Sequence, residues 1–256
     1  MWMNRYERLT ALLELLAERG RVEVDDIAEE LQVSAATIRR DLDHLAEQQL
    51  LTRTRGGAVA HAVSYDLPLR YKTARHADAK LRIARAAAAL VEKGAVVGLN
   101  GGTTATEVAR ALAARSELDL TIVTNALNIA NELTVRQQIK LVVTGGVVRP
   151  QSYELIGPLA RLIPDELTLD VIFLGVDHVD PKLGASARNE GEAAINRLLA
   201  ERSGRVVVVA DSSKLGGSAF VRICPIEQVD GLITDTEADD AVVAQFRDHG
   251  IDVQLV

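Results

Sequence analysis

From Ala79 onward, short runs of β-branched residues alternate with longer stretches of helical periodicity, an order that few architectures accommodate. The run Val206–Val209 is apolar at four consecutive positions, as in a strand covered on both faces. Repeated strand–helix units of this kind build a sheet with helices packed against it. We therefore predict an open α/β sandwich with a mostly parallel sheet over residues 79–256. Its expected strands include Ala95–Leu99, Leu120–Val123, Lys140–Val143, Val171–Gly175, Arg205–Ala210 and Gly231–Thr234.

Residues 1–63 follow a different order, namely helix, strand, helix, turn, helix and hairpin. Asn4 and Glu7 have the spacing of a capping box at the start of the first helix. Asp25 is expected to cap a short second helix, and Ser34 a third helix that runs from Ala35 to about Gln48. This order predicts a winged helix-turn-helix, with Leu50–Arg53 and Ala58–Val63 as its hairpin.

The segment Ser64–Asp78 has no clean periodicity and carries Pro68, so we expect a linker over residues 64–78. The net charge of −7 argues against a general polyanion binder. Residues 51–85 nevertheless hold eight basic and two acidic residues, a local charge of 8 − 2 = +6. A basic segment beside an acidic domain favours two separate tasks on one chain, although a solvated charged face is the plainer alternative.

Several classes of protein are excluded or disfavoured by composition. Cys224 is the only cysteine, which excludes an internal disulfide and a cysteine-based metal site, and we expect it to be a buried strand residue. The five histidines are scattered without metal-ligand spacing, so no metal site is predicted. We also expect no cofactor. No apolar run approaches the roughly 20 residues that span a bilayer, and no secretion signal is evident, so we expect a cytoplasmic protein with no membrane partner.

The third predicted helix has the features of a groove-reading helix. If Ile38 faces the core, steps of about 100° turn Ala36 and Arg40 outward, with Thr37 and Arg39 on the flanks. We expect Arg40 to contact a base edge, Arg39 a phosphate, and Asp41 an arginine within the domain. On its own, a pair of arginines on a helix is more often solvated. The order of elements favours contact with double-stranded DNA by Ser34, Ala36, Thr37, Arg39, Arg40 and, from the wing, Arg53 and Arg55.

A second candidate site follows the predicted strands. Glycines and hydroxyl side chains between Asn100 and Thr104 precede a predicted helix. This pattern is equally typical of an anion-binding site at the helix N-terminus and of a plain glycine turn. Because parallel strands end at one edge of a sheet, residues after other strands can converge there, with Lys214 as the counter-charge. The candidate ligand-binding residues are Asn100, Gly101, Gly102, Thr103, Thr104, Asn125, Gly145, Gly146, Asp177, Glu190 and Lys214.

These motifs together resemble the DeoR-type bacterial transcriptional regulators. Residues 22–45 read Val-x-Val-x-x-Ile-Ala-x-x-Leu-x-Val-Ser-x-x-Thr-Ile-Arg-Arg-Asp-Leu-x-x-Leu, and residues 51–58 read Leu-x-Arg-x-Arg-Gly-Gly-Ala. Gly101-Gly102-Thr103-Thr104, Thr144-Gly145-Gly146 and Asp211-Ser212-Ser213-Lys214 stand where motifs of that family's sensor domain stand. The resemblance implies a repressor of sugar or polyol catabolism with a phosphorylated sugar or polyol effector.

Further expectations follow from the resemblance. We expect a homo-oligomer, at least a dimer, that places two recognition helices on repeated half-sites. Two residues depart from the family pattern, because Asn100 stands where an Asp is common and His178 where a Gly is usual. These departures bear on the choice of effector.

Two other functions are compatible with the sequence. The C-terminal part resembles ribose-5-phosphate isomerase and the coenzyme A transferases at the level of fold, and Asp177, Lys214 and Glu190 are types that transfer protons. An enzyme with an added DNA module is therefore one alternative, although a likeness of fold is weak evidence of function. The other is a protein-interaction module, which predicts no salt-dependent affinity for DNA. We assign no catalytic residue.

Overall fold

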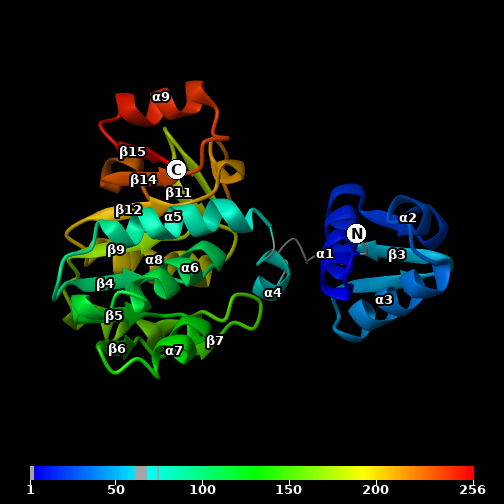
Figure 1. Ribbon diagram of the computed structural model, residues 1–256, viewed down its shortest axis with the longest axis horizontal. Helices are drawn as coiled ribbons and strands as arrows, with labels where there is room; N and C mark the ends of the chain where they lie inside the picture. Colours follow the sequence, from blue (N-terminus) through cyan, green and yellow to red (C-terminus); the bar gives the residue numbers. More distant parts are fainter. Residues whose placement is uncertain (1–2, 61–67, 74) are drawn as a thin grey trace. The chain divides into compact units, whose positions relative to one another are not determined.

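The computed structural model describes residues 3–60, 68–73 and 75–256, which divide into two compact units (Figure 1). The N-terminal unit is Met1–Arg75 and the C-terminal unit is His76–Val256. The described residues of the expected linker, 64–78, are divided between the two units. Helix α4 (Leu69–Lys72) belongs to the N-terminal unit, and α5 (Ala77–Ala89) is the first helix of the C-terminal unit. Residues 64–67 and 74 of that range, and 61–63 of the expected hairpin, lie outside the described residues.

The N-terminal unit has the predicted order of elements, and two of its helix starts are set by the predicted caps. Both hydrogen bonds of the Asn4–Glu7 capping box are present, and the Ser34 hydroxyl accepts from the Thr37 N–H at 3.1 Å. The second helix begins at Val24, and its N-cap residue is Glu23, whose side chain makes no capping hydrogen bond. The prediction that Asp25 caps this helix is therefore wrong. The helices are α1 (Arg5–Arg19), α2 (Val24–Glu30) and α3 (Ala35–Glu47), and the strands are β1 (Arg21–Glu23), β2 (Leu51–Thr54) and β3 (Gly57–Ala60).

The core of this unit is aliphatic and fixes the orientation of α3. Ile38, Leu42 and Leu45 are completely buried, and they pack with Leu12 of α1 and Ile27 of α2. Strands β2 and β3 form an antiparallel hairpin, and β1 pairs with β3, which gives the sheet order β1-β3-β2. Because one face of α3 is committed to this core, its opposite face is exposed.

Helix α4 packs on the N-terminal unit through one aromatic residue. The ring of Tyr71 is buried and stacks on Tyr6 of α1, with the ring centroids 6.0 Å apart. The Tyr71 hydroxyl donates to Gln48 Oε1 at 2.8 Å, and Gln48 is the residue that ends α3. The segment after the hairpin is thus joined to both α1 and the end of α3.

The C-terminal unit is built on a seven-stranded sheet in which every neighbouring pair is parallel (Figure 1). The strand order is β15-β14-β12-β9-β4-β5-β6. This confirms the predicted α/β fold with a parallel sheet. The strands, in chain order, are β4 (Val96–Leu99), β5 (Leu120–Thr124), β6 (Ile139–Val143), β9 (Val171–Leu174), β12 (Val206–Val209), β14 (Gly231–Thr234) and β15 (Asp252–Leu255).

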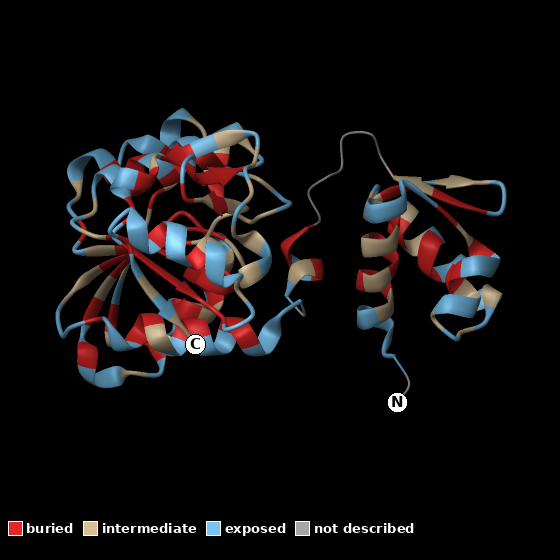
Figure 2. Ribbon diagram, turned by 90° about the horizontal axis from the view of Figure 1, so that it is seen from above, coloured by how far each residue is buried: buried red, intermediate tan, exposed pale blue. Residues whose placement is uncertain are grey.

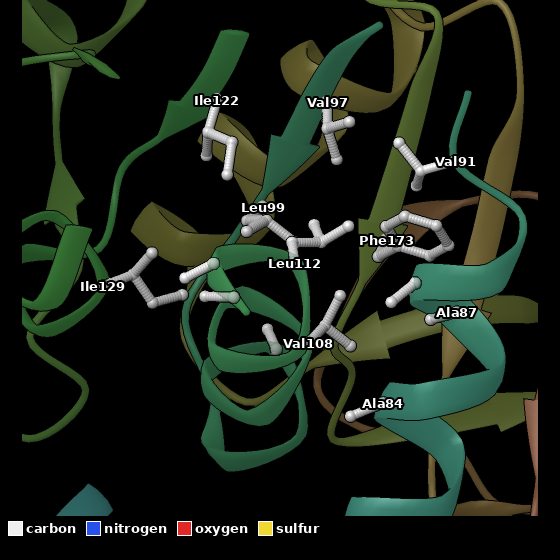
Figure 3. Close-up of a cluster of buried hydrophobic side chains, with 14 of the residues drawn as sticks. Ala84, Ala87, Val91, Val97, Leu99, Val108, Leu112, Ile122, Ile129 and Phe173 are labelled. Atoms are coloured by element: carbon white, nitrogen blue, oxygen red, sulfur yellow. The ribbon is translucent and has the colours of Figure 1, made fainter. Parts of the chain in front are cut away.

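Both faces of the sheet are covered, and alternate residues of a strand face opposite layers. On one face, α5, α6 (Thr103–Ala113) and α7 (Leu127–Leu133) pack on residues such as Leu99 and Phe173. Figure 3 shows both side chains within the cluster that includes Val108 and Leu112 of α6 and Ala87 of α5. On the other face, α8 (Glu190–Glu201) and α9 (Asp240–Asp248) pack on residues such as Ile172. The strands are accordingly mostly buried, and the helices carry exposed residues on their outer sides (Figure 2).

Two small antiparallel sheets were not predicted from the sequence. One joins β10 (His178–Asp180), β11 (Gly184–Ala187) and β13 (Val221–Cys224), and the other pairs β7 (Val147–Val148) with β8 (Leu155–Ile156). Cys224 lies buried on β13, as predicted, and burial raises the pKa of its thiol to about 11. No helix among the described residues is long and apolar enough to cross a membrane.

Candidate functional site

The exposed face of α3 carries the residues that the sequence proposes for DNA. Ala36, Arg39 and Arg40 are exposed, and Thr37 is half-buried, where its hydroxyl lies 2.9 Å from that of Ser34. Ile38, on the opposite side of the helix, has no exposed surface. The helix therefore presents small residues and two arginines near its N-terminal end, a pattern suited to the major groove.

Asp41 holds α3 against α1. Its side chain is almost completely buried, and it accepts from Arg8 Nε at 2.5 Å, with Arg5 Nε 3.7 Å from its other carboxylate oxygen. This confirms the prediction that Asp41 ties down an arginine within the domain. A buried pair of this kind fixes the direction in which the exposed face of α3 points.

The hairpin is joined to α3 by Arg53. Arg53 Nε donates to Asp43 Oδ1 at 2.7 Å, and its guanidinium also donates to the carbonyl oxygen of Gly57. The DNA contact predicted for Arg53 would thus be made by a side chain that already has two bonds within the domain. Arg55, at the turn of the hairpin, is exposed.

In the C-terminal unit, the predicted ligand residues follow the carboxyl ends of the parallel strands. The segment from Asn100 to Thr104 follows β4, Asn125 follows β5, Asp177 lies after β9, and Lys214 lies after β12. From β4 the chain continues through α6 to β5, and from β9 through α8 to β12, with these helices on opposite faces. The topological switch point therefore lies between the adjacent strands β4 and β9, and open α/β sheets bind ligands at the carboxyl ends of the strands at such a point.

Asn100 joins the ends of β4 and β9 across this switch point. Its Nδ2 donates to the Gly175 carbonyl at 2.9 Å, and its Oδ1 accepts from the Gly175 N–H at 2.7 Å. The first bond needs a side-chain N–H donor and the second a side-chain oxygen acceptor, and an amide has both. An ionised carboxylate can only accept, so an aspartate here cannot make the two bonds together. The departure from the family pattern at Asn100 thus has a structural consequence.

The loop after Asn100 leaves the start of α6 open. Gly102 has a φ of +119°, which other residues rarely adopt, and nothing lies within 4 Å of a Cβ added there. No side chain among the described residues caps α6. The first N–H groups of a helix have no partner within the helix, and with the helix dipole they favour an anion. Thr103, at this end, is half-buried and Thr104 is buried.

Glu154, which the sequence analysis missed, lies against this loop. It is only 4% exposed, and a Cβ added to Gly101 would lie 2.5 Å from its Oε1. Its Oε2 accepts from Asn125 Nδ2 at 2.8 Å, so it joins two of the predicted segments. Glu154 precedes β8 in the β7–β8 hairpin rather than following a strand of the main sheet. The sequence signal for Glu154 is weak, because it shows only an acidic residue four positions after Pro150 in a region without regular periodicity.

A second buried acid lies close to Glu154. Glu192 of α8 is 6% exposed and pairs with Arg149 at 3.0 Å. Burial and the negative charges of Glu192 and Asp177 raise the pKa of Glu154 to about 8, although hydrogen bonds from Asn125 and Asn196 oppose the shift. Glu154 is therefore mostly neutral at pH 7.

The remaining charged candidates form a second group on the same edge. Asp177 accepts from the Arg188 N–H at 2.8 Å, and a bridge between Val179 and Leu215 places Lys214 beside His178. Burial and the positive charges of Lys214 and Arg188 lower the pKa of His178.

The other departure from the family pattern, His178, fits closely against Gly217. A Cβ added to Gly217 would lie 2.7 Å from His178 Nδ1, so the imidazole fills the space of a side chain there. Asp177 acts electrostatically on both Glu154 and His178, which relates this group to the loop.

Three of the predicted ligand-binding residues have no described contact with either of these two groups of residues. Glu190 is exposed in the first turn of α8. Gly146 packs against Ala160 and the Ile156 carbonyl, each 2.8 Å from an added Cβ, which indicates a packing role. Gly145 has open space around it and a φ of +76°. The described residues contain no group of three or more His, Cys, Asp or Glu side chains that could hold a metal ion.

Replacing Asn100 by aspartate is expected to destabilise the C-terminal unit by about 2 kcal/mol, because the Gly175 carbonyl loses its donor and faces a carboxylate oxygen. The measurement is hydrogen exchange of the β4 and β9 amides in the full chain. Asn131→Asp, at an exposed position of α7, is the matched control and should leave exchange unchanged. Equal exchange in the two variants would contradict the role given to Asn100.

Comparison with known proteins agrees with this architecture. Residues 8–62 match the DeoR-like helix-turn-helix domain, and residues 75–236 match the DeoR C terminal sensor domain. The glycerol-3-phosphate regulon repressor of Escherichia coli (strain K12) is 34% identical over 253 residues, which cover 99% of this chain and 100% of that protein. The HTH-type transcriptional repressor GlcR of Bacillus subtilis (strain 168) is 31% identical over 254 residues, which cover 98% and 96%.

Among solved structures, ribose 5-phosphate isomerase A from Methanocaldococcus jannaschii aligns with a TM-score of 0.42 and 25% identity over 54% of each chain. The two full-length relatives are transcriptional regulators rather than enzymes, so the isomerase alternative is not supported. With both domains matched in the expected order, the chain belongs to the DeoR family of helix-turn-helix transcriptional regulators.

Proposed function

We propose that this chain represses a sugar or polyol catabolic operon and that a phosphorylated sugar or polyol intermediate releases it from its DNA operator. The observation that carries the proposal is the open loop from Gly101 to Thr104 at the switch point of the sheet, on a chain with an exposed arginine-bearing helix. The loop suits the phosphate group, and hydroxyl groups of a ligand can bond to Asn125 and Asp177. The name of the related glycerol-3-phosphate regulon repressor supports the same class of regulon, and the name of the other relative supports repression.

The proposed mechanism couples the two units. Contacts from Ser34, Ala36, Thr37, Arg39, Arg40, Arg53 and Arg55 hold the operator, and a homo-oligomer places two copies of α3 on repeated half-sites. The effector binds one of two conformations more tightly, which alters the spacing of the DNA-binding units through residues 64–78. The bonds of Tyr71 to α1 and to the end of α3 support a path from this segment to the recognition helix.

Lys214→Ala is expected to raise the effector concentration for half-release of operator DNA about tenfold, because a charge-assisted hydrogen bond to phosphate is lost. The measurement is fluorescence anisotropy of labelled DNA from upstream of the gene and its neighbours, at about 0.15 M salt. A panel of phosphorylated sugars and polyols, beginning with glycerol 3-phosphate, is titrated into the complex.

The control is Lys93→Ala, an exposed lysine that precedes β4 and so lies at the opposite edge of the sheet. Both variants should bind the operator within about twofold of the unmodified chain, since neither residue belongs to the proposed DNA surface. Release at equal effector concentration in the two variants would remove Lys214 from the site. Release by no phosphorylated compound in the unmodified chain would contradict the proposed effector class.

A further inference from the structure

We propose that Glu154 is a ligand-recognition residue of the sensor site and that it works as a neutral carboxylic acid, which couples anion binding at the Gly101–Thr104 loop to the proton on Glu154. The inference rests on the proposed effector site and adds a residue to it. It also predicts a property of that site, because an anion should be bound together with a proton.

The first step is geometric. The Glu154 carboxyl is 4% exposed and lies against Gly101, where it occupies the space that a side chain at that position would need. Gly101 is the residue before the N-cap of α6, so the carboxyl adjoins the open start of that helix. An ionised carboxylate there would repel the phosphate that the loop is suited to hold.

The second step compares the partners of the neighbouring acids. Glu192 has the guanidinium of Arg149 at 3.0 Å, and Asp177 has Arg188 at 3.8 Å, with a further bond from the Arg188 N–H. The bonds that the structure gives Glu154 come from the side-chain amides of Asn125 and Asn196, which carry no charge. Of these three neighbouring acids, Glu154 is therefore the one whose side-chain partners are all uncharged, and such an environment favours its neutral form.

The third step is an unused polar atom. Asn125 is completely buried, and its Oδ1 has no hydrogen-bond partner among the described residues, while its Nδ2 bonds to Glu154. A buried acceptor without a hydrogen-bond donor lowers the stability of the folded protein, so a donor is expected at this position. A hydroxyl group of a ligand can supply it. The Glu154–Asn125 pair thus offers recognition groups beside the loop that takes the anion.

The groups that face Glu154 determine the pH dependence. They are Glu192 and Asn196 on α8, Asp177 after β9, Asn125 after β5 and the uncharged Gly101 loop after β4, with Arg149 paired to Glu192. Burial and the two acids raise the pKa of Glu154 to about 8, and a bound anion adds a further negative charge that raises it more. Anion affinity should therefore be full well below pH 8 and fall as the pH rises through 8, by up to tenfold per pH unit between the pKa of the free protein and the higher pKa of the complex.

The test measures sulfate binding to the full chain by calorimetry between pH 7 and pH 9.5. Sulfate keeps both negative charges throughout this range, so any change in affinity comes from the protein. Wild type should lose about tenfold in affinity from pH 8.5 to 9.5 and take up a proton on binding, which two buffers of different ionisation enthalpy reveal. Glu154→Gln is neutral at every pH and should show neither effect. Glu201→Gln, an exposed acid at the other end of α8, should behave as wild type.

The outcomes separate this inference from the proposed function. Sulfate binding with the same pH dependence in wild type and Glu154→Gln overturns the role of Glu154 and leaves the anion site intact. Absence of sulfate binding in both overturns the anion site, and the role of Glu154 with it. Where Glu154→Gln does not fold, carbon-13 NMR of the wild-type Glu154 carboxyl replaces it. Titration near pH 8 that moves upward with sulfate supports the proposal, and titration below pH 6 contradicts it.

Discussion

Replacing Asp41 by alanine is expected to lower the free energy of unfolding of the N-terminal unit by about 3 kcal/mol. The Asp41 side chain is 4% exposed and that of Arg8 12%, so the substitution leaves a mostly buried guanidinium without its carboxylate. The same pair fixes α3 against α1, and operator affinity should fall with stability. The measurement is hydrogen exchange of the α3 amides in the full chain, where protection should drop about 100-fold.

The matched control is Asp43→Ala, two residues further along the same helix. Asp43 also pairs with an arginine, at 2.7 Å, but its side chain is 59% exposed and that of Arg53 is 29% exposed. Pairs near the surface contribute about 0–1 kcal/mol, so exchange in α3 should change less than tenfold. Amides of β4 serve as an internal reference in both variants. A similar loss of protection in the two variants would show that burial does not distinguish these pairs.

The features that could be predicted from the sequence are those set by local chemistry. The caps at Asn4 and Ser34 act within three residues, and the apolar spacing of α3 places Ile38 in the core whatever surrounds it. The parallel strands were also found, because residues covered on both faces leave continuous apolar runs such as Val206–Val209. Asp25 was misassigned because it lies beside the helix start, and the sequence cannot tell a cap from a first-turn acid.

The antiparallel strands could not be predicted in the same way. Strand β10 has three residues, β11 has four and contains no large apolar side chain, and β7 and β8 have two each. Such short segments carry no periodicity, and their pairing depends on contacts between distant parts of the chain. These segments nevertheless position functional groups, since β10 begins with His178 and Glu154 directly precedes β8.

The candidate site shows the same division. Residues that follow main-sheet strands, such as Asn100 and Asn125, could be named because parallel strands end at one edge. Their partners could not, because the bonds to Gly175 and Glu154 span 75 and 29 residues. The sequence predicts Asn100 as a ligand residue, and in the structure both ends of its amide are bonded to the backbone of Gly175, in the loop after β9. Its effect on the ligand is therefore expected through the shape of the switch point.

Arg40→Ala is expected to weaken binding to the preferred operator sequence 10- to 100-fold at about 0.15 M salt, a loss of about 1–3 kcal/mol. Arg40 is exposed on the face of α3 opposite to the buried Ile38, where a guanidinium can pair with a guanine edge. DNA selected from a random library by the wild-type chain supplies the sequence, and fluorescence anisotropy with excess nonspecific competitor supplies the affinities. Preference at one base pair should relax in the variant.

Two further variants make the assignment of Arg40 specific. Arg39→Ala should weaken all DNA sequences alike and reduce the salt dependence by about one counterion, because a phosphate contact carries no sequence information. Arg19→Ala removes an exposed arginine that pairs with Glu30 at 2.8 Å, between α1 and α2, and should leave DNA binding unchanged. If Arg39→Ala and Arg40→Ala lose affinity equally for selected and random DNA, α3 holds the backbone and the sequence is read elsewhere. Arg55 would then be the next residue to replace, since it is exposed at the tip of the β2–β3 hairpin, whereas the nearby Arg53 is bonded to Asp43 and Gly57.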